Sequence, residues 1–523
     1  MTFKKYKIFN NNFFWFFLLF TFFILIQIDF YNHGALSDDL AEYIQNPLRI
    51  INGQIPYKDF WLLFPPGEVY VPALVYKIFG LQIKSILLFN VFIKSLVSSA
   101  VFILMKLICK KNIYAAVSAI LFFFMGDLQI YMFFLLFSFL FIYEYLFTEN
   151  RFWLFMAGSF VGVAFNFRFF LTGAFAFSVI TLLVLKIGKI KLLLQNILTF
   201  ILGTFLIFTF NFWLYKKFFF AMIQETVLKG LKHGTTMDIN YIDQIFISLD
   251  ILKKSFSTLL NQFGIMNSWS FMVFFFEFIL TVCLYALPFL AILIAIYLLF
   301  FKKRNFIKKE IIYLLLIWGT LVFLKSIRKP DPEHLVYANS IFLLLFIYIF
   351  SKLKTSKLKS LMNIVIIIFL MRLYVFAFHY YFNFRIPQYN VTAKFGTLQV
   401  SNEYEAKKLQ SVIRFIEQNS SRNDYILNTL FYSPPFYAMT GRKNATYYDS
   451  LIDLFTNKNF QKEKMICNQI LNSNTKLVIH NPKWKFGDRG EFDQQLPILQ
   501  KCIDQNFVLK EKNDEYWLYK KMS

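Results

Sequence analysis

Two adjacent carboxylates, Asp38 and Asp39, stand just beyond the first long hydrophobic stretch of the chain. Carboxylates at a membrane are costly unless they are paired, solvated or functional. A carboxylate can take the proton of a hydroxyl nucleophile, and burial or a neighbouring like charge raises its pKa toward the range of a useful base. The structural alternative is that the pair caps a helix, as Asp commonly does. The residue types therefore indicate a general base, with capping as the other reading.

The residues that follow the pair carry helix and turn signals. Apolar residues recur at helical spacing, which predicts an amphipathic helix over 38–52 that lies along the membrane interface. Gly53 and Pro56 would end this helix. A rigid turn then precedes a second short apolar helix over 68–79. The turn contains Tyr57, Lys58, Asp59, Pro65, Pro66 and Gly67.

A second polar segment, RKPDPEH at 328–334, lies between two hydrophobic stretches. An Arg fork and a protonatable His can hold the negative charge that grows on a leaving phosphate, so Arg328 and His334 are predicted to bind phosphate. Asp331 would orient either of them. The alternative is a polar turn whose Arg extends to the lipid headgroups. Arg168 has the same two readings, since its setting, FNFRFFLTGAF, is apolar.

A divalent metal is an open alternative for the first site. Asp38, Asp39 and Asp59 offer hard oxygen ligands of the kind that suit Mg²⁺ or Mn²⁺ shared with a phosphate. The chain has no DxD signature, and acid pairs of this kind also work without a metal. No confident metal ligand follows from the sequence.

The elements that must position these residues are hydrophobic helices. Of the 523 residues, 57% are hydrophobic and 21% are aromatic, which indicates a polytopic membrane protein rather than a soluble one. Hydropathy predicts about eleven spans of roughly 20 residues each. We place them near 13–30, 84–107, 112–126, 128–147, 152–169, 171–186, 192–213, 271–300, 311–327, 335–351 and 360–382.

Basic residues gather in every second connection between these spans, which by the positive-inside rule places the N-terminus in the cytoplasm and the C-terminus outside. The net charge of +24 is mostly this topology signal, so no nucleic-acid partner is expected. The cytoplasmic segments are too short for a nucleotide-sugar or ATP site. The larger segments, 31–83, about 214–270 and 383–523, would lie outside, where a donor carried by the lipid itself is the natural substrate. Lys216 and Lys217 fall in the outer segment 214–270, although basic residues are usually cytoplasmic. This indicates an anionic lipid headgroup as their partner. The alternative is that they are ordinary surface charges.

The composition turns polar after about residue 400. Helical patterns at 403–418 and 492–504 alternate with short β-rich runs, which predicts a separate small α/β domain. Cys467 and Cys502 share this domain, and whether they form a disulfide is open. The β-rich runs are 425–427, 476–479 and 516–519.

The pattern from Asp38 to Gly67 resembles the first outer loop of GT-C type membrane glycosyltransferases, the superfamily of dolichyl-phosphate-mannose protein mannosyltransferases and aminoarabinose transferases. There it runs Asp-acid-x-x-x-Tyr, Gly-x-x-Pro-Tyr-x-Asp and then Pro-Pro. Segment 328–334 also resembles a loop of bacterial members, and the family often places an Arg at the turn that holds Arg168. The matching positions are Asp38, Asp39, Tyr43, Gly53, Pro56, Tyr57, Asp59, Pro65 and Pro66.

The resemblance implies that Asp38 is the base and Asp39 its neighbour, and that the donor is a polyprenyl-phosphate sugar. We therefore expect an all-α polytopic protein of GT-C fold over 1–383, including loop 31–83, and an extracytoplasmic α/β domain over 384–523. It would transfer a sugar with inversion to a lipid, surface glycan or protein acceptor in a bacterial plasma (inner) membrane. The alternatives are a transporter or flippase of lipid-linked sugars, which should carry midplane polar residues and broken helices, and a glycan polymerase or ligase.

Overall fold

The computed structural model forms two compact units. Unit 1 comprises Met1–Ile26, Phe92–Phe219 and Thr226–Asn383, and unit 2 comprises Gln27–Val91, Phe220–Glu225 and Phe384–Ser523. The structure describes residues 3–29, 31–32, 38–62, 64–215, 218–228, 250, 285–299, 308–327, 332–352, 389–400, 402–430, 435–448, 451, 459–485 and 491–522.

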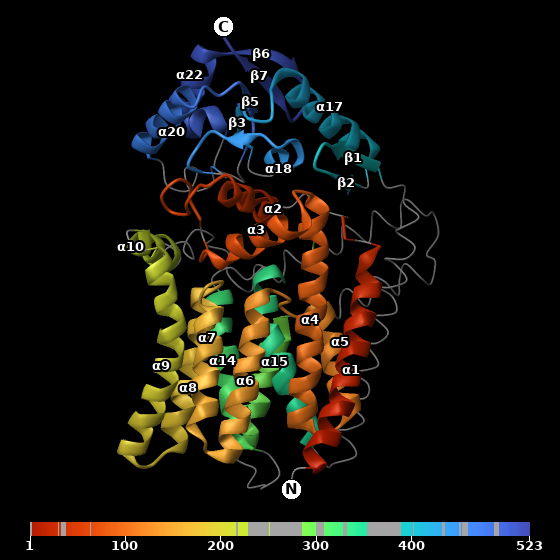
Figure 1. Cartoon of the computed structure of the whole chain (residues 1–523), viewed down its shortest axis with the longest axis vertical. Coiled ribbons are helices and arrows are strands. Elements are labelled where there is room, and N and C mark those ends of the chain that lie inside the picture. The colour runs from red at the N-terminus through yellow and green to blue at the C-terminus, as the bar shows by residue number, and fades with distance from the viewer. Residues whose placement is uncertain are drawn as a thin grey trace. The chain divides into compact units, whose positions relative to one another are not determined.

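Unit 1 consists of apolar helices that run side by side (Figure 1). Within the described residues, five helices are long and apolar enough to cross a membrane, and four more have shorter apolar stretches. This confirms the predicted membrane character, since the lengths match the ~20 residues that a bilayer requires. These nine helices are α1 (Phe3–Ile28), α4 (Ile83–Cys109), α5 (Asn112–Met125), α6 (Ile130–Thr148), α7 (Arg151–Ala164), α8 (Phe169–Lys186), α9 (Ile190–Tyr215), a helix at Tyr285–Leu299 and α15 (Pro332–Lys352). A further helix, α14 (Lys309–Ser326), precedes α15.

The number of spans remains a prediction. Of the span expected at 271–300, the structure describes only residues 285–299, and the span expected at 360–382 lies outside the described residues. Nine of the predicted spans correspond in order to helices of the structure, namely α1, α4, α5, α6, α7, α8, α9, α14 and α15.

Glycines allow α7 and α9 to approach closely. Gly158 and Gly162 stand four residues apart on α7, and Gly203 lies on α9. A Cβ atom built on any of the three would come within 3.0 Å of a backbone atom of the other helix. Small residues at such spacing let helices pack backbone to backbone in a membrane, where van der Waals contact replaces the hydrophobic effect as the driving force.

Unit 2 contains a five-stranded sheet in the order β4-β3-β5-β7-β6. β4 (Lys443–Asn444), β3 (Tyr425–Asn428) and β5 (Leu477–His480) are parallel, and β7 (Trp517–Lys521) and β6 (Phe507–Lys512) complete the sheet in antiparallel fashion. The helices are α17 (Glu403–Asn419), α18 (Phe436–Thr440), α20 (Phe460–Asn472), α21 (Phe492–Gln495) and α22 (Pro497–Asn506), and a separate hairpin pairs β1 (Tyr389–Ala393) with β2 (Gly396–Val400).

Unit 2 also contains the two helices of the first loop, α2 (Asp38–Ile51) and α3 (Gly67–Phe79). The predicted helices over 38–52 and 68–79 are therefore confirmed. Ile44 of α2 and Tyr76 of α3 share one buried cluster with Ile413 of α17 and Leu477 of β5. The apolar face of α2 is thus covered by protein within this unit. A disulfide joins Cys467 of α20 to Cys502 of α22, which answers the question that the sequence left open.

Replacing Gly158 with Val should destabilise unit 1, because the side chain would collide with the backbone of α9 near Phe200. We expect a loss of about 1–3 kcal/mol, the usual cost of overpacking. Thermal unfolding of the detergent-solubilised protein would measure it. Gly188→Val is the matched control, since no described atom lies within 4 Å of a Cβ at Gly188. Equal melting temperatures for the two variants would contradict the close α7–α9 packing.

Candidate functional site

The carboxylate pair lies at the first turn of α2, which begins at Asp38. Of Asp38, Asp39 and Leu40 the structure describes only the backbone, so the roles predicted for the two carboxylates stay predictions. α2 ends at Ile51, where Gly53 takes a φ of +82°. This left-handed conformation is readily adopted by glycine and ends many helices.

The turn after α2 is held by its own polar groups. Tyr57 has a φ of +64°, its amide donates to Phe60 O (2.8 Å) and its hydroxyl donates to Phe64 O (2.7 Å). Asp59 Oδ2 accepts the amide of Ile55 at 2.8 Å. The side chains of Tyr57 and Asp59 thus hydrogen-bond within the turn, and burial raises the pKa of Tyr57 well above its usual value.

Pro65 and Pro66 are both buried, and α3 begins at the next residue, Gly67. Proline suits this place because its fixed φ leads into a helix and its missing N–H leaves no donor unpaired at the first turn.

Arg49 connects the first loop to the C-terminal part of unit 2. Its Nη2 donates to Thr446 O at 2.8 Å and to Asp59 O at 3.2 Å, and its Nε donates to Gln54 Oε1 at 2.8 Å. The guanidinium also lies over the ring of Phe60, 4.7 Å from its centroid. Arg49 is only 6% exposed, and these contacts compensate the cost of burying its charge.

Trp61 makes a second connection within unit 2. Its amide donates to Tyr447 O (2.8 Å) and its indole Nε1 donates to Glu225 Oε2 (2.8 Å). The Tyr447 hydroxyl donates in turn to Tyr57 O at 3.2 Å. Glu225 follows α10 (Phe219–Ile223). Lys216 and Lys217, predicted to contact the donor phosphate, lie outside the described residues.

In unit 1, Arg168 belongs to a polar cluster at the α5–α6 and α7–α8 connections. Its Nε donates to Gln129 Oε1 at 2.9 Å, and Gln129 Nε2 donates to the Tyr337 hydroxyl of α15 at 3.5 Å. Lys325, an electrostatic neighbour of Arg168, lies over the ring of Phe170 at 4.8 Å. The sequence singled out Arg168 but not Gln129 or Lys325.

Asp127 is the buried acid of this cluster. Its carboxylate accepts the Tyr131 hydroxyl and the Gln129 amide, and its own amide donates to Ser340 Oγ at 2.6 Å. Burial raises the pKa of Asp127 to about 6, although these hydrogen bonds and the positive charge of Arg168 oppose the shift. The signal that could have identified it is an acid between two apolar segments, since such acids are rare without a role.

Of the segment 328–334, only His334 is described with its side chain. The backbone carbonyl of His334 accepts the Ser326 hydroxyl at 2.9 Å, and its ring lies 6.1 Å from that of Tyr337. His334 and Arg168 therefore both neighbour Tyr337 or its partner Gln129. Arg328 and Asp331 lie outside the described residues.

The described residues contain no group of three His, Cys, Asp or Glu side chains that could hold a metal ion. Asp59 uses one carboxylate oxygen in the turn, and its other oxygen lies 3.9 Å from Lys58 Nζ. Because the side chains of Asp38 and Asp39 are not described, the Mg²⁺ or Mn²⁺ alternative stays a prediction.

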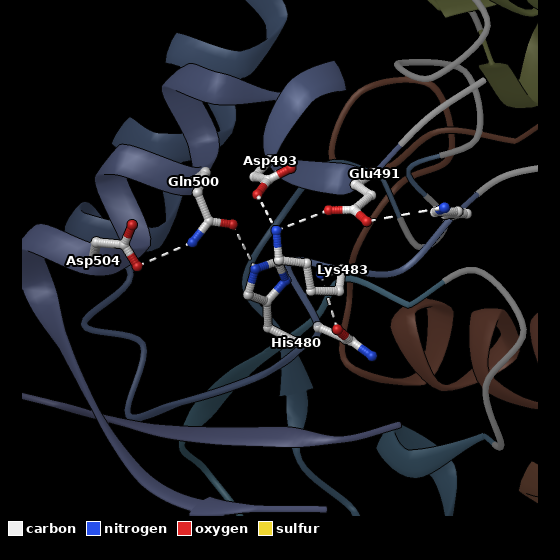
Figure 2. Close-up of polar contacts among 8 residues, drawn as sticks. His480, Lys483, Glu491, Asp493, Gln500 and Asp504 are labelled. Carbon is white, nitrogen blue, oxygen red and sulfur yellow. Dashed lines mark hydrogen bonds and ion pairs between the residues drawn. The ribbon is translucent and has the colours of Figure 1, made fainter. Parts of the chain in front are cut away.

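Polar side chains of unit 2 form a hydrogen-bonded cluster around His480 (Figure 2). Gln500 Nε2 donates to Asp504 Oδ1 (3.0 Å), so Gln500 Oε1 faces His480 Nε2 at 2.7 Å and accepts a hydrogen bond from its N–H. His480 Nδ1 then accepts the Thr429 hydroxyl at 2.8 Å. Burial lowers the pKa of His480 to about 4, so the imidazole is neutral at pH 7.

Comparisons with known proteins give weak likenesses. No protein-family model and no curated protein matches the chain. Among solved structures, the chain is similar to the Archaeoglobus fulgidus oligosaccharyltransferase in complex with Zn and sulfate, at 12% identity and a TM-score of 0.46, over 96% of this chain and 73% of that one. It is also similar to the same enzyme tethered to an acceptor peptide that contains the NVT sequon, at 11% identity and a TM-score of 0.47, over 97% and 74% of the two chains.

The His480 cluster predicts a pH-dependent stability. An unfolded His has a pKa near ~6.5, so below that pH the unfolded chain binds a proton that the folded protein does not, until the pH falls to about 4. The free energy of unfolding should therefore decrease as the pH is lowered, by about 2 kcal/mol from pH 7 to pH 5. His480→Gln lacks this titration and should show a correspondingly smaller loss when unfolding is followed by Trp fluorescence. Identical pH dependence in both proteins would contradict the buried neutral imidazole.

Proposed function

We propose that the protein is an integral membrane glycosyltransferase that transfers a sugar from a polyprenyl-phosphate donor to an extracytoplasmic acceptor. Asp38 acts as the base, with Asp39 as its neighbour. Arg168, Arg328, His334, Lys216 and Lys217 bind the donor phosphate, and Asp331 orients the segment around it. Tyr57, Asp59, Pro65 and Pro66 shape the first loop. The acceptor is a lipid, a surface glycan or a protein.

The observation that carries the proposal is the position of Arg168 in the helix bundle of unit 1. One end of this bundle carries basic residues in its helix connections and is called the basic end, and Arg168 lies at the opposite end. Consecutive helices alternate in direction, so the α7–α8 connection lies opposite to those before α7 and after α8. Those connections hold basic residues: Lys186 pairs with Glu149 (3.3 Å) and Arg151 with Gln195 (2.6 Å). By the positive-inside rule the basic end is expected in the cytoplasm, which supports an outer position for Arg168. An Arg there suits a lipid phosphate, because its planar fork matches phosphate oxygens.

In the proposed reaction, Asp38 takes the proton of the acceptor hydroxyl while the oxygen attacks the anomeric carbon. The bond from that carbon to the phosphate oxygen breaks at the same time, and polyprenyl phosphate leaves with its electron pair. The cations hold the growing negative charge, and Asp38 retains the proton until solvent removes it. Attack opposite to the leaving phosphate inverts the anomeric configuration.

The disulfide supports the same orientation for the C-terminal region. Disulfides form and persist in oxidising compartments outside the cytosol, and Cys467–Cys502 joins two helices of this region. A C-terminal region outside a bacterial plasma membrane, with the N-terminus in the cytoplasm, fits both the disulfide and the distribution of basic residues.

Asp38→Asn and Arg168→Gln test the proposal in lipid nanodiscs supplied with a panel of polyprenyl-phosphate sugars, with release of polyprenyl phosphate as the signal. We expect Asp38→Asn to lower the rate by about 10²–10⁴-fold because the base is lost. Arg168→Gln should lower it by about 10²–10³-fold because one charge on the leaving phosphate is lost.

Arg151→Gln is the matched control, since Arg151 lies at the basic end and contacts Gln195; it should keep the wild-type rate within about twofold, as surface changes usually do. Donor that is bound but never cleaved by the wild-type protein would refute a transferase and favour the transporter. Release that is unchanged in Asp38→Asn would refute the role of this carboxylate.

A further inference from the structure

Unit 2 contains a pocket that the proposed reaction does not use. It lies between the second half of α2 and the edge of the sheet at β3 and β4, and it is partly open to solvent. Gln45, Arg49 and Gln54 line it from the first loop, and Tyr425, Arg442 and Lys443 line it from the C-terminal part.

The pocket is positively charged. Arg49, Arg442 and Lys443 line it, and its described lining contains no Asp or Glu, although Glu417 and Asp424 are electrostatic neighbours of Arg442 outside the lining. Arg442 donates to Thr440 O and Ser420 O, both at 2.5 Å, and to Ser420 Oγ at 3.1 Å, all of them neutral oxygens. Lys443 Nζ lies over the ring of Tyr425 at 5.8 Å, and among the described residues no carboxylate lies within ion-pair distance of it. These charges favour an anionic ligand.

The pocket also presents an acceptor without a donor. Gln45 is 8% exposed, and its Oε1 is buried without a hydrogen-bond partner among the described residues. A buried acceptor left unpaired costs about 1–3 kcal/mol, so a ligand that brings an O–H or N–H to this atom recovers that cost. Gln54 adds a free amide donor, because its Oε1 is already taken by Arg49 while its Nε2 has no partner in the described part of the chain.

We propose that this pocket binds an acidic saccharide, a sugar that carries a carboxylate or a phosphate. The cations recognise the anionic group, and Gln45 and Gln54 recognise ring hydroxyls. The inference goes beyond the proposed transfer reaction and does not depend on it, because binding at this pocket is measured without turnover.

The test titrates the full-length protein in nanodiscs with glucuronate, glucose 6-phosphate, glucose and inorganic phosphate by isothermal calorimetry. At least one of the two acidic sugars should bind tenfold or more tightly than both glucose and inorganic phosphate. The two acidic sugars distinguish a carboxylate site from a phosphate site. Tighter binding of inorganic phosphate than of either sugar would overturn the assignment to a saccharide.

Two variants assign the binding to this pocket. Lys443→Gln should weaken the acidic sugar about tenfold, and Gln45→Leu should weaken it similarly by removing the buried acceptor while keeping the volume. Lys510→Gln, on the exposed part of β6, is the matched control and should bind as wild type does. Melting temperatures show whether each variant is folded. Absence of binding to the wild-type protein, or equal affinity in folded wild-type, Lys443→Gln and Gln45→Leu proteins, would overturn the proposal and leave a water-filled pocket.

Discussion

The first loop and the C-terminal α/β region of unit 2 bury their apolar side chains in one common core. Ile44, Tyr76 and Ile86, from α2, α3 and α4, lie in the same cluster as Val412, Phe436 and Leu477. Neither part could remain folded in this form alone, because each would expose the apolar face that the other covers. The positions of α2 and of the turn after it therefore depend on a domain that begins more than 300 residues later in the chain.

Hydrogen bonds in unit 2 fix the first loop in one position against the C-terminal region. Arg49 is held by carbonyls from both parts, and the backbone of Trp61 donates to Tyr447. Such buried polar groups must be paired, since each unpaired one costs free energy. They fix the loop in one arrangement, with the left-handed Tyr57 at its centre. A loop held so firmly is a suitable support for the first turn of α2, where Asp38 and Asp39 stand, and for the pocket along its second half.

The apolar helices of unit 1 are held together by a different force, because in lipid the hydrophobic effect does not drive helices to associate. Gly158, Gly162 and Gly203 give α7 and α9 close backbone contact. The polar groups gather at the helix connections, where Asp127, Gln129 and Arg168 satisfy one another or their neighbours. The acid and the cation are thus both hydrogen-bonded at the ends of the helices.

The sequence by itself determined the elements whose signal is local. The apolar helices, α2 and α3, and the strands β3, β5 and β7 follow from runs and periodicities within some 5–25 neighbouring residues. The tertiary structure alone decided the strand order, the Cys467–Cys502 disulfide, the neighbours of Arg168 and the contact of Arg49 with Thr446, which are separated by 397 residues. Periodicity tells which face of an element is buried but not which partner covers it, because that choice is set by packing over the whole chain.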